Sequence, residues 1–168
     1  MQSDLQQAGS DPKAFTDLYQ TYYRRVFQYM CYRCDCSATA EDLTAQTFER
    51  ILHSLPRYQE GEAPIEAWIF TIAANCFRDW YRRQKRLAWL PWDQFIRHPA
   101  AQPAPEEQVQ VHEEQRELQR ALNTLSERER SLIAWRFGAR MTNRQIATLS
   151  HLSEQNVAVI LFRALRKL

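Results

Sequence analysis

The sequence predicts an all-α protein made of two small helical domains joined by a linker. Glycine, which strands, hairpins and phosphate-binding loops use heavily, supplies only 3 of the 168 residues, well below its usual share of about 7%. Apolar residues recur every three or four positions in both halves, as they do on one face of a helix. We therefore expect a helical bundle at 11–86, a linker at 87–113 and a second helical unit at 114–168.

The overall composition is that of a globular chain. Hydrophobic residues make up 45% and charged residues 25% of the sequence, and the net charge is +2, which excludes a wholly disordered chain. No run of about 18 apolar residues is present, so no membrane insertion is expected. The segment Met1–Pro12 is polar and lacks the apolar core of a signal peptide, so we expect a cytoplasmic location.

Two helices are expected at the start of the first unit. The first begins near Asp11-Pro12, because proline is favoured in the first turn of a helix. The second has Ser37 or Thr39 as a possible N-cap and ends before Pro56. Apolar positions at helical spacing are Ala14, Phe15, Leu18, Tyr19, Tyr22, Val26, Phe27 and Met30 in the first helix and Ala40, Leu43, Thr47, Ile51 and Leu55 in the second.

A third helix follows a polar loop at 57–64 and ends in the basic run at 82–86. Its apolar stripe is formed by Ile65, Trp68, Ile69, Ile72, Ala73, Cys76 and Trp80. Basic residues also alternate with rings here, a composition that suits unstacked DNA because cations follow the backbone and rings stack on bases. These residues are Phe70, Phe77, Trp80 and Tyr81 with Arg78, Arg82, Arg83 and Arg86. Trp68 and Trp80 are nevertheless expected in the core, since both lie on the apolar stripe.

The linker combines prolines with large apolar residues. The prolines interrupt helices, and the apolar residues either fold back on a neighbouring domain or dock on a partner. The residues concerned are Pro91, Pro99, Pro103 and Pro105 with Trp89, Leu90, Trp92, Phe95 and Ile96.

The second unit predicts a helix-turn-helix. Ser126 with Glu129 and Thr142 with Gln145 are capping boxes that begin two helices, and Ser153 caps the last helix. A short helix, a tight turn and a capped longer helix form this motif. Its small core is expected from Ile146, Ala147, Leu152, Val157 and Leu161.

Such a motif presents the start of its last helix to the major groove of DNA. Gln155 and Asn156 carry amides that can pair with adenine, and Val159 lies one turn further on. Arg144, Arg163, Arg166 and Lys167 could hold phosphates. An ordinary helical hairpin with a solvated polar face is the alternative.

Cys31, Cys34 and Cys36 form a C-x-x-C-x-C cluster. Zinc prefers four thiolate or imidazole ligands, which Cys76 or His53 could complete, and a redox switch or a disulfide is also possible. A paired C-x-x-C is absent, so reduced thiols are the expected state and the cluster is only a weak metal candidate.

The sequence resembles the extracytoplasmic-function (ECF) sigma factors of the sigma-70 superfamily. The resemblance covers nearly the whole chain after Asp11, and the order and spacing of the motifs carry it. The similar stretches are 14–19 (AFTDLY), 40–48 (AEDLTAQTF), 67–75 (AWIFTIAAN), 125–130 (LSERER) and 163–168 (RALRKL).

The resemblance implies a dissociable subunit of bacterial RNA polymerase with two sigma-like domains, region 2 and region 4. The first would bind the polymerase clamp through the helix face that carries Glu41, Asp42, Ala45, Gln46 and Glu49. It would also bind the minus-ten promoter element through Asn75, Arg78, Asp79, Arg82, Arg83 and Arg86, with Asn75 and the 57–64 loop capturing a flipped base.

The resemblance implies further that the second domain docks on the polymerase flap and reads the minus-thirty-five element. The linker would pass near the active site and the RNA exit path, and an anti-sigma factor would be a further partner. Ala45 and Gln46 depart from the Gln and Glu usual in the family, so clamp affinity is expected to differ. Ala158 and Ile160 replace frequent cations, which should weaken phosphate attraction. Upstream readout then rests on Gln155 and Asn156, or the apolar face binds a protein.

Two other classes of function fit the sequence less well. A stand-alone helix-turn-helix regulator that never binds polymerase would need neither the 41–46 nor the 68–75 stretch. An enzyme is not expected, because no nucleophile motif, phosphate loop or paired carboxylates occur, and the four histidines, His53, His98, His112 and His151, are scattered. No cofactor is expected.

Overall fold

The computed structural model describes residues 12–58, 63–87 and 117–168, and every regular element in these ranges is helical. The expected linker, its tryptophans and the centre of the 57–64 loop lie outside the described residues. The first unit contains α2 (Pro12–Arg33), α3 (Ser37–Ser54), the short 3-10 turn η1 (Leu55–Arg57) and α4 (Ile65–Leu87). The second contains a helical segment at 117–122, α6 (Glu127–Ile133), the π-helical turn η2 (Ala134–Gly138), α7 (Asn143–Ser150) and α8 (Glu154–Leu165).

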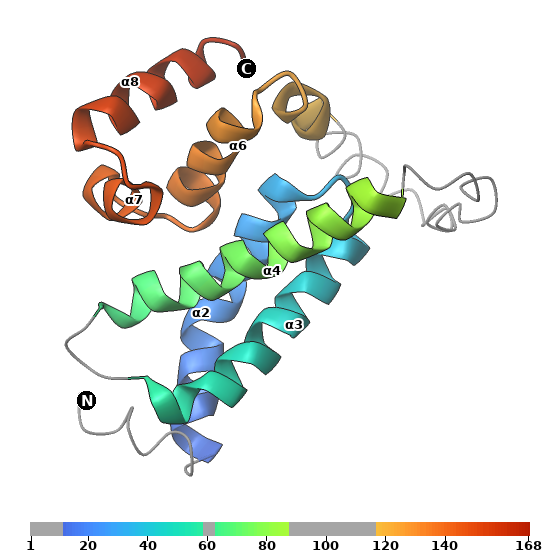
Figure 1. Cartoon of the computed structure of the whole chain (residues 1–168), viewed down its shortest axis with the longest axis vertical. Helices are drawn as coiled ribbons and strands as arrows, with labels where there is room; N and C mark the ends of the chain where they lie inside the picture. The colour runs from blue at the N-terminus through green and yellow to red at the C-terminus, as the bar shows by residue number, and fades with distance from the viewer. Residues whose placement is uncertain (1–11, 59–62, 88–116) are drawn as a thin grey trace, which may run out of the picture.

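The three long helices of the first unit pack side by side (Figure 1). The residues that they bury include Val26 and Met30 of α2, Leu43 and Ile51 of α3, and Ile69 of α4. This core matches the periodicity of the sequence. The second helix begins differently from the expectation: Cys36 is its N-cap, and the Cys36 thiol lies 3.0 Å from the Thr39 hydroxyl.

The second unit begins its helices where the sequence predicts. Ser126 and Thr142 each accept a hydrogen bond from the backbone three residues later, and both capping boxes are complete. The Ser153 side chain caps α8 by accepting a hydrogen bond from the backbone N–H of Asn156. Between α7 and α8 the chain turns at His151, which has a φ of 54°. The helix-turn-helix predicted from these caps is therefore present, with Ile146, Val157 and Leu161 buried between its helices.

The second unit packs directly on α2 of the first, above α4 in Figure 1. Gly138 permits the close approach, because a Cβ atom at this position would lie 2.7 Å from the Cα atom of Tyr29. Atoms of the backbone cannot move aside as a flexible side chain can. Any larger residue at 138 would therefore push the two units apart.

Three arginines join the two units. Arg25 donates to the carbonyl of Ala139 at 2.9 Å and forms an ion pair with Glu66, which also accepts from Gln145 at 2.8 Å. Arg25 therefore connects α2 and the start of α4 to the backbone that precedes α7.

Arg33 and Arg130 connect the other end of the junction. Arg33 is buried, donates to the Ser131 hydroxyl at 2.6 Å and pairs with Glu127. Arg130 donates to the carbonyl of Tyr32 at 2.8 Å and to Asp35 at 3.2 Å. Both arginines therefore hold α6 against the C-terminal end of α2.

The packing corrects one expectation about the aromatic residues of α4. Phe70 and Phe77, which the basic and aromatic pattern offered as stacking partners for bases, are buried. Phe70 meets Tyr29 edge to face at 5.9 Å, and the Arg33 guanidinium lies 4.1 Å from the centre of the Phe77 ring. Neither ring can stack on DNA in this arrangement. Trp68 and Trp80 pack against the core, as their place on the apolar stripe predicts.

Candidate polymerase and promoter-binding surfaces

The structure places the predicted functional residues on three separate surfaces, each formed by one helix or by the helix-turn-helix. The first surface is the outward face of α3, which carries Glu41, Asp42, Ala45, Gln46 and Glu49, all exposed. The opposite face of α3 is buried. Leu52, 44% exposed, extends this surface by one turn. Sequence reasoning missed it, although its position three residues after Glu49 was the available signal.

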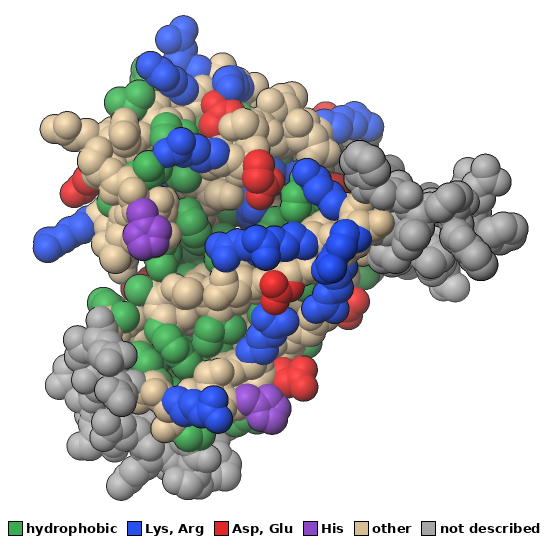
Figure 2. Space-filling view, in the orientation of Figure 1, with side chains coloured by type: hydrophobic (Ala, Val, Ile, Leu, Met, Phe, Trp, Pro, Cys, Tyr) green, Lys and Arg blue, Asp and Glu red, His purple; other side chains and the backbone are tan. Residues whose placement is uncertain are grey.

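The second surface runs along α4. Asn75, Arg78, Arg82 and Arg86 are exposed and follow one another at helical spacing, with Arg83 beside them. Figure 2 shows basic side chains along the part of the surface that α4 forms. Arg78 donates to the Asn75 side chain at 2.9 Å, so an amide and a cation sit together at the start of the basic stretch.

Asp79 differs from its neighbours on α4. Its carboxylate accepts a hydrogen bond from Arg50 of α3 at 2.9 Å. Asp79 therefore ties α4 to α3, and in this arrangement its charge is already paired. Arg50 was not among the predicted site residues.

The third surface is formed by α7 and α8. Arg144, Gln155, Asn156, Val159, Arg163 and Arg166 are all exposed. Lys167 is engaged elsewhere, because its ammonium group lies 2.6 Å from Glu129 of α6. This hydrogen bond, with those from Ser126, holds the pKa of Glu129 at about 2. Lys167 thus fastens the end of α8 to the capping box of α6.

The cysteines do not gather into a metal centre in the described residues, where no group of three His, Cys, Asp or Glu side chains could hold an ion. Cys31, Cys34, Cys36 and Cys76 are all free thiols. Burial raises the pKa of Cys34 to about 12 and that of Cys31 to about 11. Burial therefore favours the protonated thiol over the thiolate at both residues.

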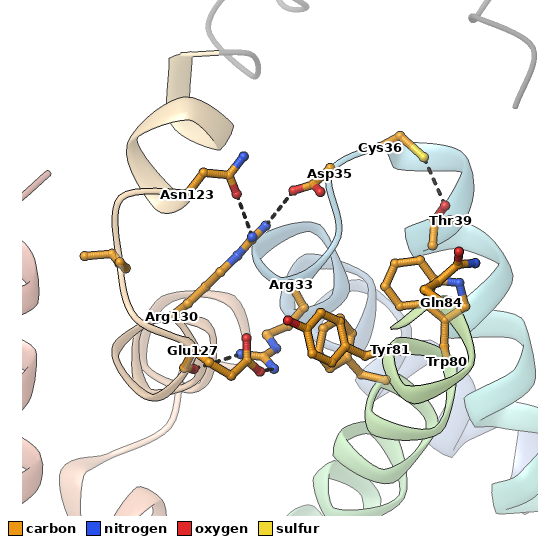
Figure 3. A pocket seen from close by; sticks show the side chains of 12 residues that line it. Arg33, Asp35, Cys36, Thr39, Trp80, Tyr81, Gln84, Asn123, Glu127 and Arg130 are labelled. Atoms are coloured by element: carbon orange, nitrogen blue, oxygen red, sulfur yellow. Dashed lines mark hydrogen bonds and ion pairs between the residues drawn. The ribbon is translucent and has the colours of Figure 1, made fainter. Parts of the chain in front are cut away.

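A cleft of about 500 Å³ lies between the two units, bounded by Arg33, Trp80, Tyr81, Glu127 and Arg130. Figure 3 shows Arg130 reaching across it toward Asn123 and Asp35. The Arg130 guanidinium donates to Asn123 at 2.7 Å, so its charge is used within the junction. Phe77, Trp80 and Tyr81, which the aromatic and basic pattern offered as stacking partners for bases, line this cleft, whereas the predicted DNA-binding arginines and the α3 face do not.

None of the described helices is long and apolar enough to cross a membrane.

Comparison with known families separates the chain into the same two parts. Residues 18–87 match the family described as Sigma-70 region 2, and residues 115–168 match Sigma-70, region 4. The α3 and α4 surfaces lie within the first match, and the α7–α8 surface lies within the second.

Whole-chain relatives agree with these matches. The chain is 30% identical over 162 residues to the ECF RNA polymerase sigma factor SigX of Bacillus subtilis, and the aligned part covers 93% of this chain and 82% of SigX. The fold is similar to that of the sigma factor RpoE of Bartonella quintana, solved with the anti-sigma factor NepR, with a TM-score of 0.72, 21% identity and coverage of 92% and 94%. CnrH, solved with the cytosolic domain of CnrY, gives a TM-score of 0.71 at 23% identity and coverage of 96% and 89%. The chain belongs to the ECF RNA polymerase sigma factors of the sigma-70 family.

Proposed function

We propose that this chain binds core RNA polymerase through the outward face of α3 and directs promoter recognition, DNA melting and transcription initiation. Residues 11–86 and 114–168 act as its two domains, and 87–113 links them. The observation that carries the proposal is the separation of three exposed surfaces along one chain, with the α3 and α4 surfaces within the Sigma-70 region 2 match and the α7–α8 surface within the region 4 match.

Each surface has a chemistry that suits its role. The α3 face is acidic and amidic, with Glu41, Asp42 and Glu49 as its exposed charges, and it suits a basic surface of the polymerase clamp. The α4 surface places Asn75 and Arg78 beside each other ahead of Arg82 and Arg83, so that an amide can bind an unstacked base while cations follow the strand. The α7–α8 surface suits the minus-thirty-five element.

The chain acts by binding, without a reaction of its own, and works in the cytoplasm where polymerase is found. An anti-sigma factor is a further partner on this proposal. The solved structures of RpoE and CnrH, which share this fold, contain NepR and CnrY as bound partners.

The first test is retention of the full-length chain by bacterial core RNA polymerase. We expect the wild-type chain to be retained by the polymerase and an Asp42→Arg, Glu49→Arg variant not to be retained, because the variant reverses two of the three exposed carboxylates of the α3 face. An Asp17→Arg, Glu117→Arg variant makes the same change of charge at exposed positions outside α3 and should be retained. No retention of the folded wild-type chain would contradict the proposal and favour a stand-alone helix-turn-helix regulator.

A further inference from the structure

The outward face of α8 is apolar where a DNA-reading helix would meet bases. Val157, Leu161 and Ala164 are buried and define its inward face. Two residues that are two positions apart lie about 200° from each other around a helix. Gln155 and Val159 are two positions from Val157, and Phe162 is two positions from Ala164, so all three point outward. Phe162 is 63% exposed, more than any other large hydrophobic side chain in the described residues. Val159 is 45% exposed.

Cations surround this outward stripe. Arg166 continues it one turn beyond Phe162, and its guanidinium lies 5.9 Å from the centre of the Phe162 ring. Arg163 lies on one flank of the helix, on the same side as Asn156, and Arg144 is exposed on α7. One acidic residue, Glu154, lies in the first turn of α8. An apolar stripe within a cationic rim fits a partner that is polyanionic at its edges and apolar between them.

Duplex DNA has this arrangement in the major groove. The phosphates form the charged edges, and the C5-methyl group of thymine is the apolar group that the base pairs present there. An apolar side chain discriminates thymine by contact with this methyl group. A protein partner would cover the apolar stripe as well, but the three arginines around the stripe favour a polyanion.

We propose that Val159 and Phe162 read thymine methyl groups in the upstream promoter element, while Arg163 faces the flanking backbone. The inference rests on the proposed function and deepens it by naming the chemical group that is recognised.

The test replaces thymine by deoxyuridine, which removes the methyl group and keeps the pairing edge. Duplexes are first selected from a random pool by the full-length chain and then resynthesised with deoxyuridine at each thymine in turn. At the contacted positions we expect wild-type affinity to fall about fourfold for each methyl group, from the free energy of burying one such group. At the positions that lose affinity in this way through Phe162, the Phe162→Ala variant should bind the thymine and deoxyuridine duplexes equally, and a Val159→Ala, Phe162→Ala variant should do so at every position.

Leu165→Ala is the matched control. Leu165 is 49% exposed on the same helix but lies on its side, away from the outward stripe, so this variant should keep the preference for thymine. Equal wild-type affinity for thymine and deoxyuridine duplexes would overturn the inference while leaving promoter binding intact.

Two further results would also overturn the inference. One is a Phe162→Ala variant that loses a protein partner but keeps the preference for thymine. The other is failure to select any duplex. When the chain is still retained by polymerase, that failure refutes DNA readout by α8 but not the polymerase-binding part of the proposed function.

Discussion

The junction between the two units and the outward face of α8 use their side chains in opposite ways. At the junction, Arg25, Arg33 and Arg130 each form hydrogen bonds with the opposite unit, and Gly138 lies against the backbone of Tyr29. On α8, Val159 and Phe162 remain exposed. The side chains of the junction stabilise the packing of the two units, whereas those on the outward face of α8 remain available for contact with a partner. Substitutions at the junction should therefore change stability, and substitutions on the outward faces should change binding.

The largest effect is expected for Gly138→Ala. Alanine ordinarily stabilises a helical position relative to glycine by about 0.5–1 kcal/mol. Here its Cβ atom would meet the Tyr29 backbone, and we expect the free energy of unfolding to fall by about 3 kcal/mol. Chemical denaturation of the variant and the wild-type chain measures this change in the free energy of unfolding. Ala158→Gly, at an exposed position of α8, is the converse control and should cost about 1 kcal/mol from helix propensity alone. A stabilised Gly138→Ala variant would show that the units do not pack this closely.

The next effect is expected for Arg25→Ala. The substitution leaves the carbonyl of Ala139 and the carboxylate of Glu66 without their shared donor, which should lower the free energy of unfolding by about 1–2 kcal/mol. Arg24→Ala, at the adjacent exposed position, should leave it unchanged. The coupling free energy of Arg25 with Glu66 can be measured by a double-mutant cycle. A value of zero would show that this ion pair does not stabilise the junction.

A smaller effect, below about 1 kcal/mol, is expected for Glu129→Gln. Glutamine can keep the capping box but cannot pair with Lys167. The pKa of Glu129 is lowered from 4.5 to about 2 in the folded chain, so its contribution is complete above pH 4.5 and is lost as the pH falls toward 2. Wild-type stability should therefore decline more steeply than that of the variant over this window. Parallel curves would contradict the role given to Lys167.

The smallest effect on stability is expected for Arg82→Glu, Arg83→Glu. Both residues are exposed, and the free energy of unfolding should stay within about 0.5 kcal/mol. Promoter opening should nevertheless weaken more than polymerase binding does, with a shallower salt dependence, because two phosphate contacts are lost. Opening can be followed by the reactivity of unpaired bases, and polymerase binding by retention. An equal loss of both would contradict the assignment of these arginines to the strand.

The sequence predicted local features better than contacts between distant parts of the chain. Ser126, Thr142 and Ser153 were identified as caps because a cap and its partner lie three residues apart. The buried state of Phe70 and Phe77 was missed, since their ring contacts are with Tyr29 and Arg33 of α2, about 40 positions away along the chain. Arg33 and Gly138 carry no local sign of their role for the same reason.

The same distinction between local features and distant contacts applies to the candidate surfaces. The exposed positions of α3 and α4 followed from helical period, because the opposite face of each helix is apolar. The pairing of Asp79 with Arg50 and of Lys167 with Glu129 joins different helices, so no pattern within one helix could indicate it.

The contact of Gly138 with Tyr29 has a consequence for promoter geometry. Elements centred near minus ten and minus thirty-five are about 25 base pairs apart, which is about 85 Å of duplex at about 3.4 Å per pair. The longest described helix, α4, has 23 residues and spans only about 35 Å. On the proposed function, a chain that occupied both elements at once would adopt an extended form in which this contact is broken. The population of that form would multiply the affinity for every promoter alike, so residue 138 would act on the strength of binding without touching DNA.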